Sequence, residues 1–122
     1  MMKPVLLIFL ITMNLPFGFS DKRKVLLFST DKNNSQLIRQ QMILDNGRKG
    51  MQERDIVVET YISGEQNQNI FKKYKAQDLP FLFILIGKDG GEKLRSTSPV
   101  NNQKLFGLID QMPMRQSEMR RQ

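Results

Sequence analysis

The chain of 122 residues contains no cysteine, no histidine and no tryptophan. Without cysteine it cannot form a disulfide or carry out reactions that need a thiolate nucleophile. Without histidine it lacks the side chain that most often transfers protons near neutral pH, and the most common nitrogen ligand of metals. A domain of this size must therefore be held together by its apolar core or by assembly with a partner, because cross-links are not available to it.

The N-terminus has the pattern of a cleaved export signal. Lys3 supplies a positive charge, Val5–Ile11 is an uninterrupted apolar run, and Gly18–Ser20 offers small residues at a cleavage site. The apolar run is shorter than the roughly 20 residues that span a bilayer; a short membrane anchor or a first core strand are the alternatives. We predict a signal peptide over residues 1–20, one domain over residues 21–122, export to the periplasm or the medium, and no stable membrane span after cleavage.

Basic residues outnumber acidic ones by 19 to 12, which gives the whole chain a net charge of +7. Removal of Lys3 with the signal leaves a net charge of +6. A basic surface attracts polyanions and anionic membranes, so binding to a polyanion or to the envelope surface is one hypothesis. The basic residues are scattered, few aromatic residues lie among them and no recognised motif is present, so we expect no nucleic-acid partner.

Apolar runs and turn residues predict seven elements in the order β-α-β-α-β-β-α. The predicted strands cover residues 25–29, 56–62, 81–86 and 92–95. The first helix is expected to be capped by Asn33, Asn34 or Ser35, to bury Leu37, Ile38, Met42 and Leu44, and to end at Asp45–Gly47 and Gly50. The second helix covers residues 66–75. The last is expected to be capped by Ser98, with Pro99 in its first turn, and to bury Leu105, Leu108, Ile109 and Met112; Pro113 is expected to break or kink the chain after it.

The strand pattern predicts a mixed four-stranded sheet in a three-layer α/β sandwich. Phe81–Ile86 is six consecutive apolar residues, which is typical of a central strand covered on both faces. The first strands alternate with helices, which predicts right-handed parallel crossovers. The sequence GKDGG, Gly87–Gly91, predicts a tight hairpin, so the last two strands are expected to be antiparallel.

Four segments carry a resemblance to a known family: VLLFS, ERDIVV, LIGKDGGEKLRS and LFGLIDQMPMR, all within residues 23–120. They are similar to segments of a bacterial family of short secreted domains of unknown function, which is related to a domain in animal sushi-repeat-containing and coiled-coil-domain-containing extracellular proteins. The resemblance implies a thioredoxin-like fold. It also implies, as an alternative function, the peroxiredoxin-like activity suggested for some relatives.

The chain departs from thioredoxins at the positions of their C-x-x-C motif. Counted without gaps from the first strand, the two cysteine positions are occupied by Asn34 and Leu37. Thiol–disulfide exchange and peroxidatic chemistry both need a cysteine, so both are excluded for this chain acting alone. The pair Leu79-Pro80 falls at the place of the cis-proline of the fold. A cis peptide bond there would place Leu79 beside the loop Ser29–Ser35.

The loop Ser29–Ser35 between the first strand and the first helix is a predicted ligand site. A helix N-terminus offers free N–H donors and a partial positive charge, and Lys32 adds a full charge, so a small anionic ligand is expected there. The residues assigned to this site are Thr30, Asp31, Lys32, Asn34, Leu79 and Pro80. The structural alternative is a capped helix start with a solvated turn. No catalytic residue is assigned, because no neighbouring base completes a recognised triad with Ser29 or Thr30.

The segment MPMR, Met112–Arg115, is the predicted partner-binding surface. Met114, Arg115 and Glu118 are assigned to it, and the partner is an unknown protein. Methionine thioethers are also soft ligands that suit copper(I). We assign no metal, because Met112 belongs to the predicted helix stripe and no histidine or cysteine assists it.

Two other charged groups are interpreted as structural. Glu53–Asp55, before the second strand, forms an ion-pair cluster or a capping turn. The basic residues around the hairpin, Lys88, Lys93 and Arg95, discourage edge pairing.

These features together predict a non-catalytic binding or interaction module that uses no cofactor. One alternative is an enzyme of non-thiol chemistry that uses the Ser29–Ser35 loop with Asp31, Lys32 or Arg54. The other alternative is the polyanion or envelope-surface binder that the net charge of +6 suggests.

Overall fold

A computed structural model of the chain describes residues 19–121. The predicted signal peptide, residues 1–20, lies almost entirely outside these described residues. The strands are β1 (Arg23–Ser29), β2 (Ile56–Ile62), β3 (Phe81–Ile86) and β4 (Glu92–Ser96). The helices are α2 (Ser35–Asn46), α3 (Arg48–Glu53), the 3-10 turn η1 (Glu65–Asn67), α4 (Gln68–Lys73), α5 (Asn102–Asp110) and α6 (Pro113–Arg120). Within this range, no helix has the length and apolarity required to cross a membrane.

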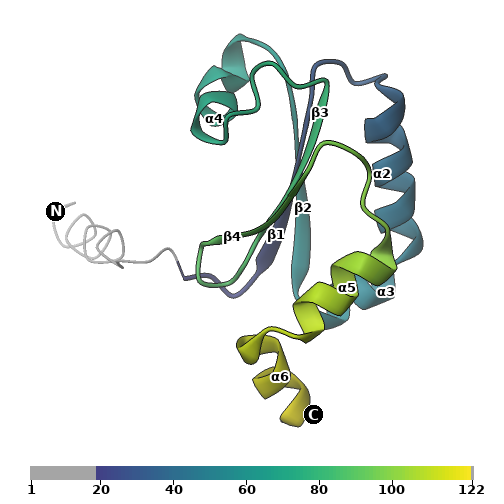
Figure 1. Cartoon of the computed structure of the whole chain (residues 1–122), viewed down its shortest axis with the longest axis vertical. Helices are drawn as coiled ribbons and strands as arrows, with labels where there is room; N and C mark the ends of the chain where they lie inside the picture. The colour runs from purple at the N-terminus through teal and green to yellow at the C-terminus, as the bar shows by residue number, and fades with distance from the viewer. Residues whose placement is uncertain (1–18, 122) are drawn as a thin grey trace, which may run out of the picture.

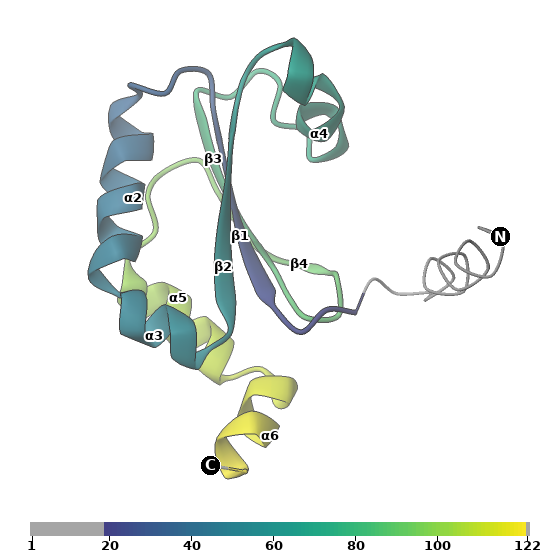
Figure 2. The same ribbon diagram turned by 180° about the vertical axis from the view of Figure 1, so that it is seen from behind.

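The four strands form one mixed sheet in the order β2-β1-β3-β4. Strand β1 runs parallel to β2 and antiparallel to β3, and β3 and β4 form the antiparallel hairpin. Gly90, in the turn of that hairpin, has a φ of 84°, a conformation that glycine adopts without a steric penalty. Helix α4 covers one face of the sheet, and α2, α3 and α5 cover the other (Figures 1 and 2). The predicted three-layer fold class and the antiparallel hairpin are confirmed.

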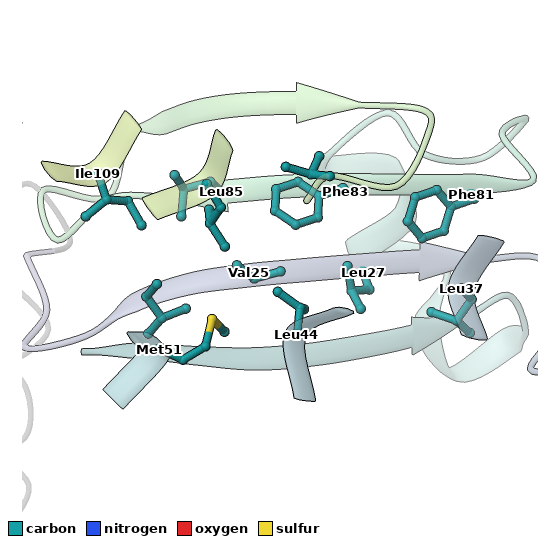
Figure 3. Close-up of a cluster of buried hydrophobic side chains, with 12 residues drawn as sticks. Val25, Leu27, Leu37, Leu44, Met51, Phe81, Phe83, Leu85 and Ile109 are labelled. Atoms are coloured by element: carbon teal, nitrogen blue, oxygen red, sulfur yellow. The ribbon is translucent and has the colours of Figure 1, made fainter. Parts of the chain in front are cut away.

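The alternation of side chains along β1 divides the core into two clusters. Val25 and Leu27 face α2, α3 and α5, whereas Leu26 and Phe28 face α4. Strand β3 is buried on both faces, as its run of six apolar residues predicts. Figure 3 shows side chains from β1, β3 and the covering helices meeting in the larger cluster, among them Leu37, Leu44, Met51, Phe81, Phe83, Leu85 and Ile109.

The predicted apolar face of the first helix is only partly buried. Leu37 and Leu44 are in the core, but Ile38 and Met42 are exposed. The expectation for these two residues is wrong because the sheet ends at β2, so the side of α2 that extends beyond this strand has no further strand to pack against. The core position that the sequence analysis missed is Gln40, which is fully buried and exchanges two hydrogen bonds with the backbone of Val100, of 2.7 and 2.9 Å.

Several helix ends also differ from the expectations. Helix α2 ends before Gly47, and α3 then begins at once and includes Gly50, so this glycine does not end helical structure. The predicted second helix is divided into η1 and α4.

One expectation at the end of the chain is wrong as well. Asn101, and not Ser98, caps α5, because its side chain accepts the N–H of Lys104 at 2.8 Å while Ser98 lies in a turn with Ser96. The expected break at Pro113 is confirmed: α5 ends at Asp110, and Pro113 starts a new helix, α6, as its missing N–H and fixed φ allow.

Candidate functional site

The loop Ser29–Ser35 lies at the carboxyl end of β1 and is organised by its own hydrogen bonds. The buried Ser29 hydroxyl donates to the backbone oxygen of Asp31 at 2.7 Å. The Asp31 carboxylate accepts the N–H of Asn33 at 3.1 Å. The Asn34 side chain accepts the N–H of Leu37 at 3.0 Å and thereby caps α2. Of the three predicted caps, the structure selects Asn34.

The segment Leu79-Pro80 lies beside this loop. The backbone oxygen of Pro80 accepts the N–H of Thr30 at 3.2 Å and the side-chain amide of Asn34 at 3.4 Å. The Leu79-Pro80 peptide bond is trans, and the Leu79 side chain packs against the core cluster under α4. The structure therefore brings Thr30, Asn34 and Pro80 together, while Asp31 and Lys32 extend into solvent.

The geometry of this loop gives no side chain an activated form. The Ser29 hydroxyl is committed to a carbonyl oxygen, which cannot accept a proton as a general base does. Asn34 and Leu37, at the two cysteine positions, each have a structural role: one caps α2, and the other is buried in the core. The arrangement matches the structural alternative, a capped helix start; ligand binding by Thr30, Asp31, Lys32, Asn34, Leu79 and Pro80 stays a prediction.

The opposite, amino end of β1 holds a network of charged side chains. Arg23, the first residue of the strand, has only 1% of its surface exposed. Its guanidinium donates two hydrogen bonds to the Glu118 carboxylate of α6, both 3.3 Å long, and one of 2.8 Å to the backbone oxygen of Arg54. These bonds attach the C-terminal helix to the start of the sheet.

Lys88, at the β3–β4 turn, joins the same network. Its Nζ lies 2.8 Å from a carboxylate oxygen of Glu118 and 2.8 Å from one of Asp55. The hydrogen bond from Lys88 lowers the pKa of Asp55 below its ordinary value of 3.8. Burial acts to raise the pKa of Glu118, but the hydrogen bonds from Lys88 and Arg23 outweigh it, so this pKa is lowered. Burial acts to lower the pKa of Lys88, and its two carboxylate partners reverse that effect.

A second branch of the network connects α3, α5 and α6. Arg54 makes a bidentate pair with Asp110, at 2.8 and 3.0 Å, and lies over the ring of Phe106 with its guanidinium carbon 4.3 Å from the ring centre. Arg115 donates to Asp110 at 3.1 Å and to the backbone oxygen of Glu53 at 3.0 Å. The hydrogen bond from Arg54 lowers the pKa of Asp110.

We call these residues the Arg23 network: Arg23, Arg54, Asp55, Lys88, Asp110, Arg115 and Glu118. Two of the residues predicted to bind a partner, Arg115 and Glu118, direct their charged groups into it, while Met114 is exposed. The sequence analysis missed Arg23 and Asp110. It interpreted Lys88 as a charge that discourages edge pairing, whereas the structure pairs Lys88 with Asp55 and Glu118. A signal for Arg23 was present, because residues 23, 25 and 27 share one face of a strand and two of them are core apolar residues.

An open groove of about 720 Å³ runs between α2, α3 and the outer edge of β2. We call it the α2–β2 groove; its lining includes Ile38, Met42, Met51, Ile56, Val58 and Thr60. Ile38, Met42 and Val58 are exposed by 42%, 62% and 42%. Neither sequence pattern nor charge identified this surface, because it depends on where the sheet ends.

The sequence profile described as "Domain of unknown function (DUF4174)" matches residues 18–118. The chain belongs to the DUF4174 family. This membership confirms the predicted relation to a family of unknown function. No curated protein matches this DUF4174 chain.

Solved structures similar to this DUF4174 domain have the thioredoxin-like fold. A thioredoxin-2 of the malaria parasite is 22% identical, with a TM-score of 0.58 over 75% of this chain and 84% of that one. The reduced 2-Cys peroxiredoxin of Plasmodium vivax is 14% identical, with a TM-score of 0.63 over 86% and 84%. Thioredoxin peroxidase I of Plasmodium yoelii is 16% identical, with a TM-score of 0.55 over 84% and 79%. At these identities the likeness shows the fold alone.

Proposed function

We propose that this DUF4174 domain is a non-catalytic binding module that accepts an apolar partner in the α2–β2 groove. The observation that carries the proposal is the exposure of Ile38, Met42 and Val58 along one concave surface. Single exposed apolar side chains are ordinary on soluble proteins, but a group of them lining a groove marks a binding surface.

The state of the former redox position supports a role without catalysis. Asn34 and Leu37 replace the two cysteines of a thioredoxin, and both are used to stabilise α2. With no cysteine in the chain, the peroxiredoxin-like alternative lacks its nucleophile. A binding role needs only the fold and an accessible surface, and this domain has both.

We also propose that the domain is exported, to the periplasm or the medium. The support is the pattern of residues 1–20, with its charged start, apolar run and small-residue cleavage site. The relation to the domain in animal extracellular proteins, which the segment LFGLIDQMPMR suggests, is part of the same proposal.

The groove is tested with the apolar fluorescent probe 1-anilinonaphthalene-8-sulfonate. We expect its fluorescence to rise on addition of dilute wild-type protein. The Met42→Glu variant should reduce this signal several-fold, because a carboxylate in the groove repels the sulfonate of the probe and makes the surface polar. Met114→Glu is the matched control, since Met114 is also an exposed methionine but lies on α6, away from the groove. Equal signals from the two variants would reject the groove as the binding surface.

The absence of catalysis is tested separately. Purified wild-type protein is assayed for disulfide reduction with dithiothreitol and for peroxide consumption, and we expect rates equal to those of the buffer. Robust turnover in either assay would overturn the non-catalytic proposal and leave the groove experiment unaffected.

A further inference from the structure

The two edges of the sheet differ in their protection against pairing with another strand. Strand β4 has five residues, a register shift at Leu85/Ile86 in its pairing with β3, and three charged side chains. Strand β2 has seven residues, a regular register with β1, and Glu59 as its one charged residue. Short, irregular and charged edges prevent strand addition, whereas a long regular edge invites it. The β2 edge belongs to the second kind.

Two backbone hydrogen bonds identify which backbone groups of β2 face outward. The Asp55 oxygen accepts the N–H of Arg23 at 2.8 Å, and the Ser63 N–H donates to the Ser29 oxygen at 2.9 Å. The backbone groups of the odd-numbered residues Asp55 and Ser63 therefore point toward β1. Along a strand, the direction of the N–H and C=O groups alternates from one residue to the next. The N–H and C=O groups of Ile56, Val58, Thr60 and Ile62 consequently point away from the sheet, on the side where no described strand pairs.

The free backbone groups and the apolar groove belong to the same residues. Ile56, Val58 and Thr60 line the α2–β2 groove with their side chains. An occupant that adds a β-strand at this edge would satisfy the open backbone groups and, at the same time, cover Ile38 and Met42 from the side.

We propose that this occupant is a second copy of the chain, which pairs its β2 antiparallel to β2 around a two-fold axis at Val58. The inference rests on the proposed binding role of the α2–β2 groove and names its partner. In this pairing Val58 faces the second copy's Val58, and Ile56 faces the second copy's Thr60. The two four-stranded sheets become one continuous sheet, and the two grooves meet across the axis because a two-fold normal to the sheet keeps both α2 helices on one face.

Charge favours this register. Glu59, the one charged residue of β2, lies 3.6 Å from Lys24 of its own chain, so its charge is already balanced within each copy. The Val58-centred pairing places the uncharged Val57 of the second copy opposite Glu59. A pairing centred on Glu59 would instead set two carboxylates directly opposite each other, which is unfavourable.

The first experiment measures the mass of the purified protein by sedimentation equilibrium from low to high micromolar concentration. We expect the mass to rise to twice the monomer value in the wild type. Val58→Lys is expected to stay monomeric, because two ammonium groups would face each other on the axis, whereas Met114→Lys dimerises like the wild type. Circular dichroism checks that both variants are folded. A wild-type protein that stays monomeric throughout overturns the inference.

The absence of cysteine from the chain permits a direct test of the register. In Val58→Cys the two new thiols belong to a hydrogen-bonded pair with Cα atoms about 5.5 Å apart, within the range of a disulfide. In the control Thr60→Cys the two thiols are about 14 Å apart along the strands and cannot join within one dimer. We expect mild oxidation to convert the first variant to a covalent dimer and to leave the second largely uncoupled. Equal coupling of both variants overturns the Val58-centred register.

The dye experiment separates this inference from the proposed function. A monomeric protein whose groove still binds the dye rejects the second copy as the occupant and retains the binding role. A protein that neither dimerises nor binds the dye rejects both.

Discussion

The two ends of β1 differ in what their polar residues do. At the carboxyl end, where a thioredoxin places its cysteines, polar residues of the Ser29–Ser35 loop make short-range bonds that form a turn and cap α2. At the amino end, Arg23 is buried and reaches across the structure to Glu118, 95 positions away in the sequence. In this domain the carboxyl end of β1 leads into a capped helix start, and buried charge is concentrated where α6 attaches to the sheet.

The difference has a physical basis. A turn exposed to solvent exchanges hydrogen bonds with water at little cost, so its side chains contribute modestly to stability. A buried ion pair loses its hydration and is tolerated only when every charge finds partners. The Arg23 network supplies these partners from β1, α5, α6 and the turns before β2 and after β3. Four experiments test this contrast, from the largest expected effect to the smallest.

Acidification acts on all the carboxylates of the network and is expected to have the largest effect. The pKa values of Asp55, Asp110 and Glu118 are lowered in the folded protein. Their ionised forms therefore stabilise the fold above the ordinary values of 3.8 to 4.5, and this stabilisation is lost as the pH falls from there through the lowered values. Urea unfolding at a series of pH values should show a steep loss of stability below about pH 4.5. A free energy of unfolding that stays constant down to pH 3 would contradict the role of the network.

Arg23→Ala removes one member of the network and should lower the free energy of unfolding by about 3 kcal/mol, because it leaves Glu118 partly buried with fewer donors. Amide hydrogen exchange should also speed up in α6. Arg48→Ala is the matched control: Arg48 is an exposed arginine paired with Asp45, and its loss should cost less than about 1 kcal/mol. Similar losses in the two variants would show that burial does not increase the contribution of Arg23 to the free energy of unfolding.

Gln40→Ala tests a buried contact without charge. Its loss leaves the N–H and C=O of Val100 without their partner in the core, so we expect a destabilisation of about 2 kcal/mol in chemical denaturation. The neighbour Gln41 is exposed on the same helix, and Gln41→Ala should change stability by only a few tenths of a kcal/mol, as surface changes do. If both variants unfold at the urea concentration that unfolds the wild type, the hydrogen bonds between Gln40 and Val100 do not stabilise the fold.

Asn34→Ala tests the cap at the carboxyl end of β1 and should have the smallest of the four effects, about 1 kcal/mol. Asn33→Ala is its control, because Asn33 uses its backbone N–H in this turn and its side chain is exposed. Thermal unfolding compares the stability of the two variants. An Asn34→Ala protein as stable as Asn33→Ala would mean that the cap contributes nothing measurable.

Sequence reasoning predicted the four strands, the sheet type and the hairpin because each depends on local signals, but it did not predict the separate helices α3 and α6. The apolar run that predicts β3 and the Asp89-Gly90 pair that predicts the turn each span only a few residues. The structure confirms the buried strand and the turn. Asn34 was one of three possible caps, and only the path of the chain at the loop distinguishes it from Asn33 and Ser35.

The same reasoning misjudged Ile38 and Met42, because helical spacing shows that a face is apolar without showing what covers it. These two side chains are exposed since nothing in the described structure extends the sheet beyond β2. It also did not single out Arg23, although the strand period places this residue on the same face as Val25 and Leu27. The predicted tail residues Arg115 and Glu118 were recognised as notable, but their partners come from distant segments that no local pattern connects.

The sequence by itself determined that thiol chemistry is absent, that the core is apolar and without cross-links, and that strands and helices follow one another in the thioredoxin-like order. Composition and short-range periodicity suffice for these properties. Only the tertiary structure decided that Arg23, Lys88 and Glu118 share one network, and that an apolar groove lies beside an unprotected strand edge. Both features arise from the packing of segments far apart in the chain, where burial and neighbours are set by the whole fold.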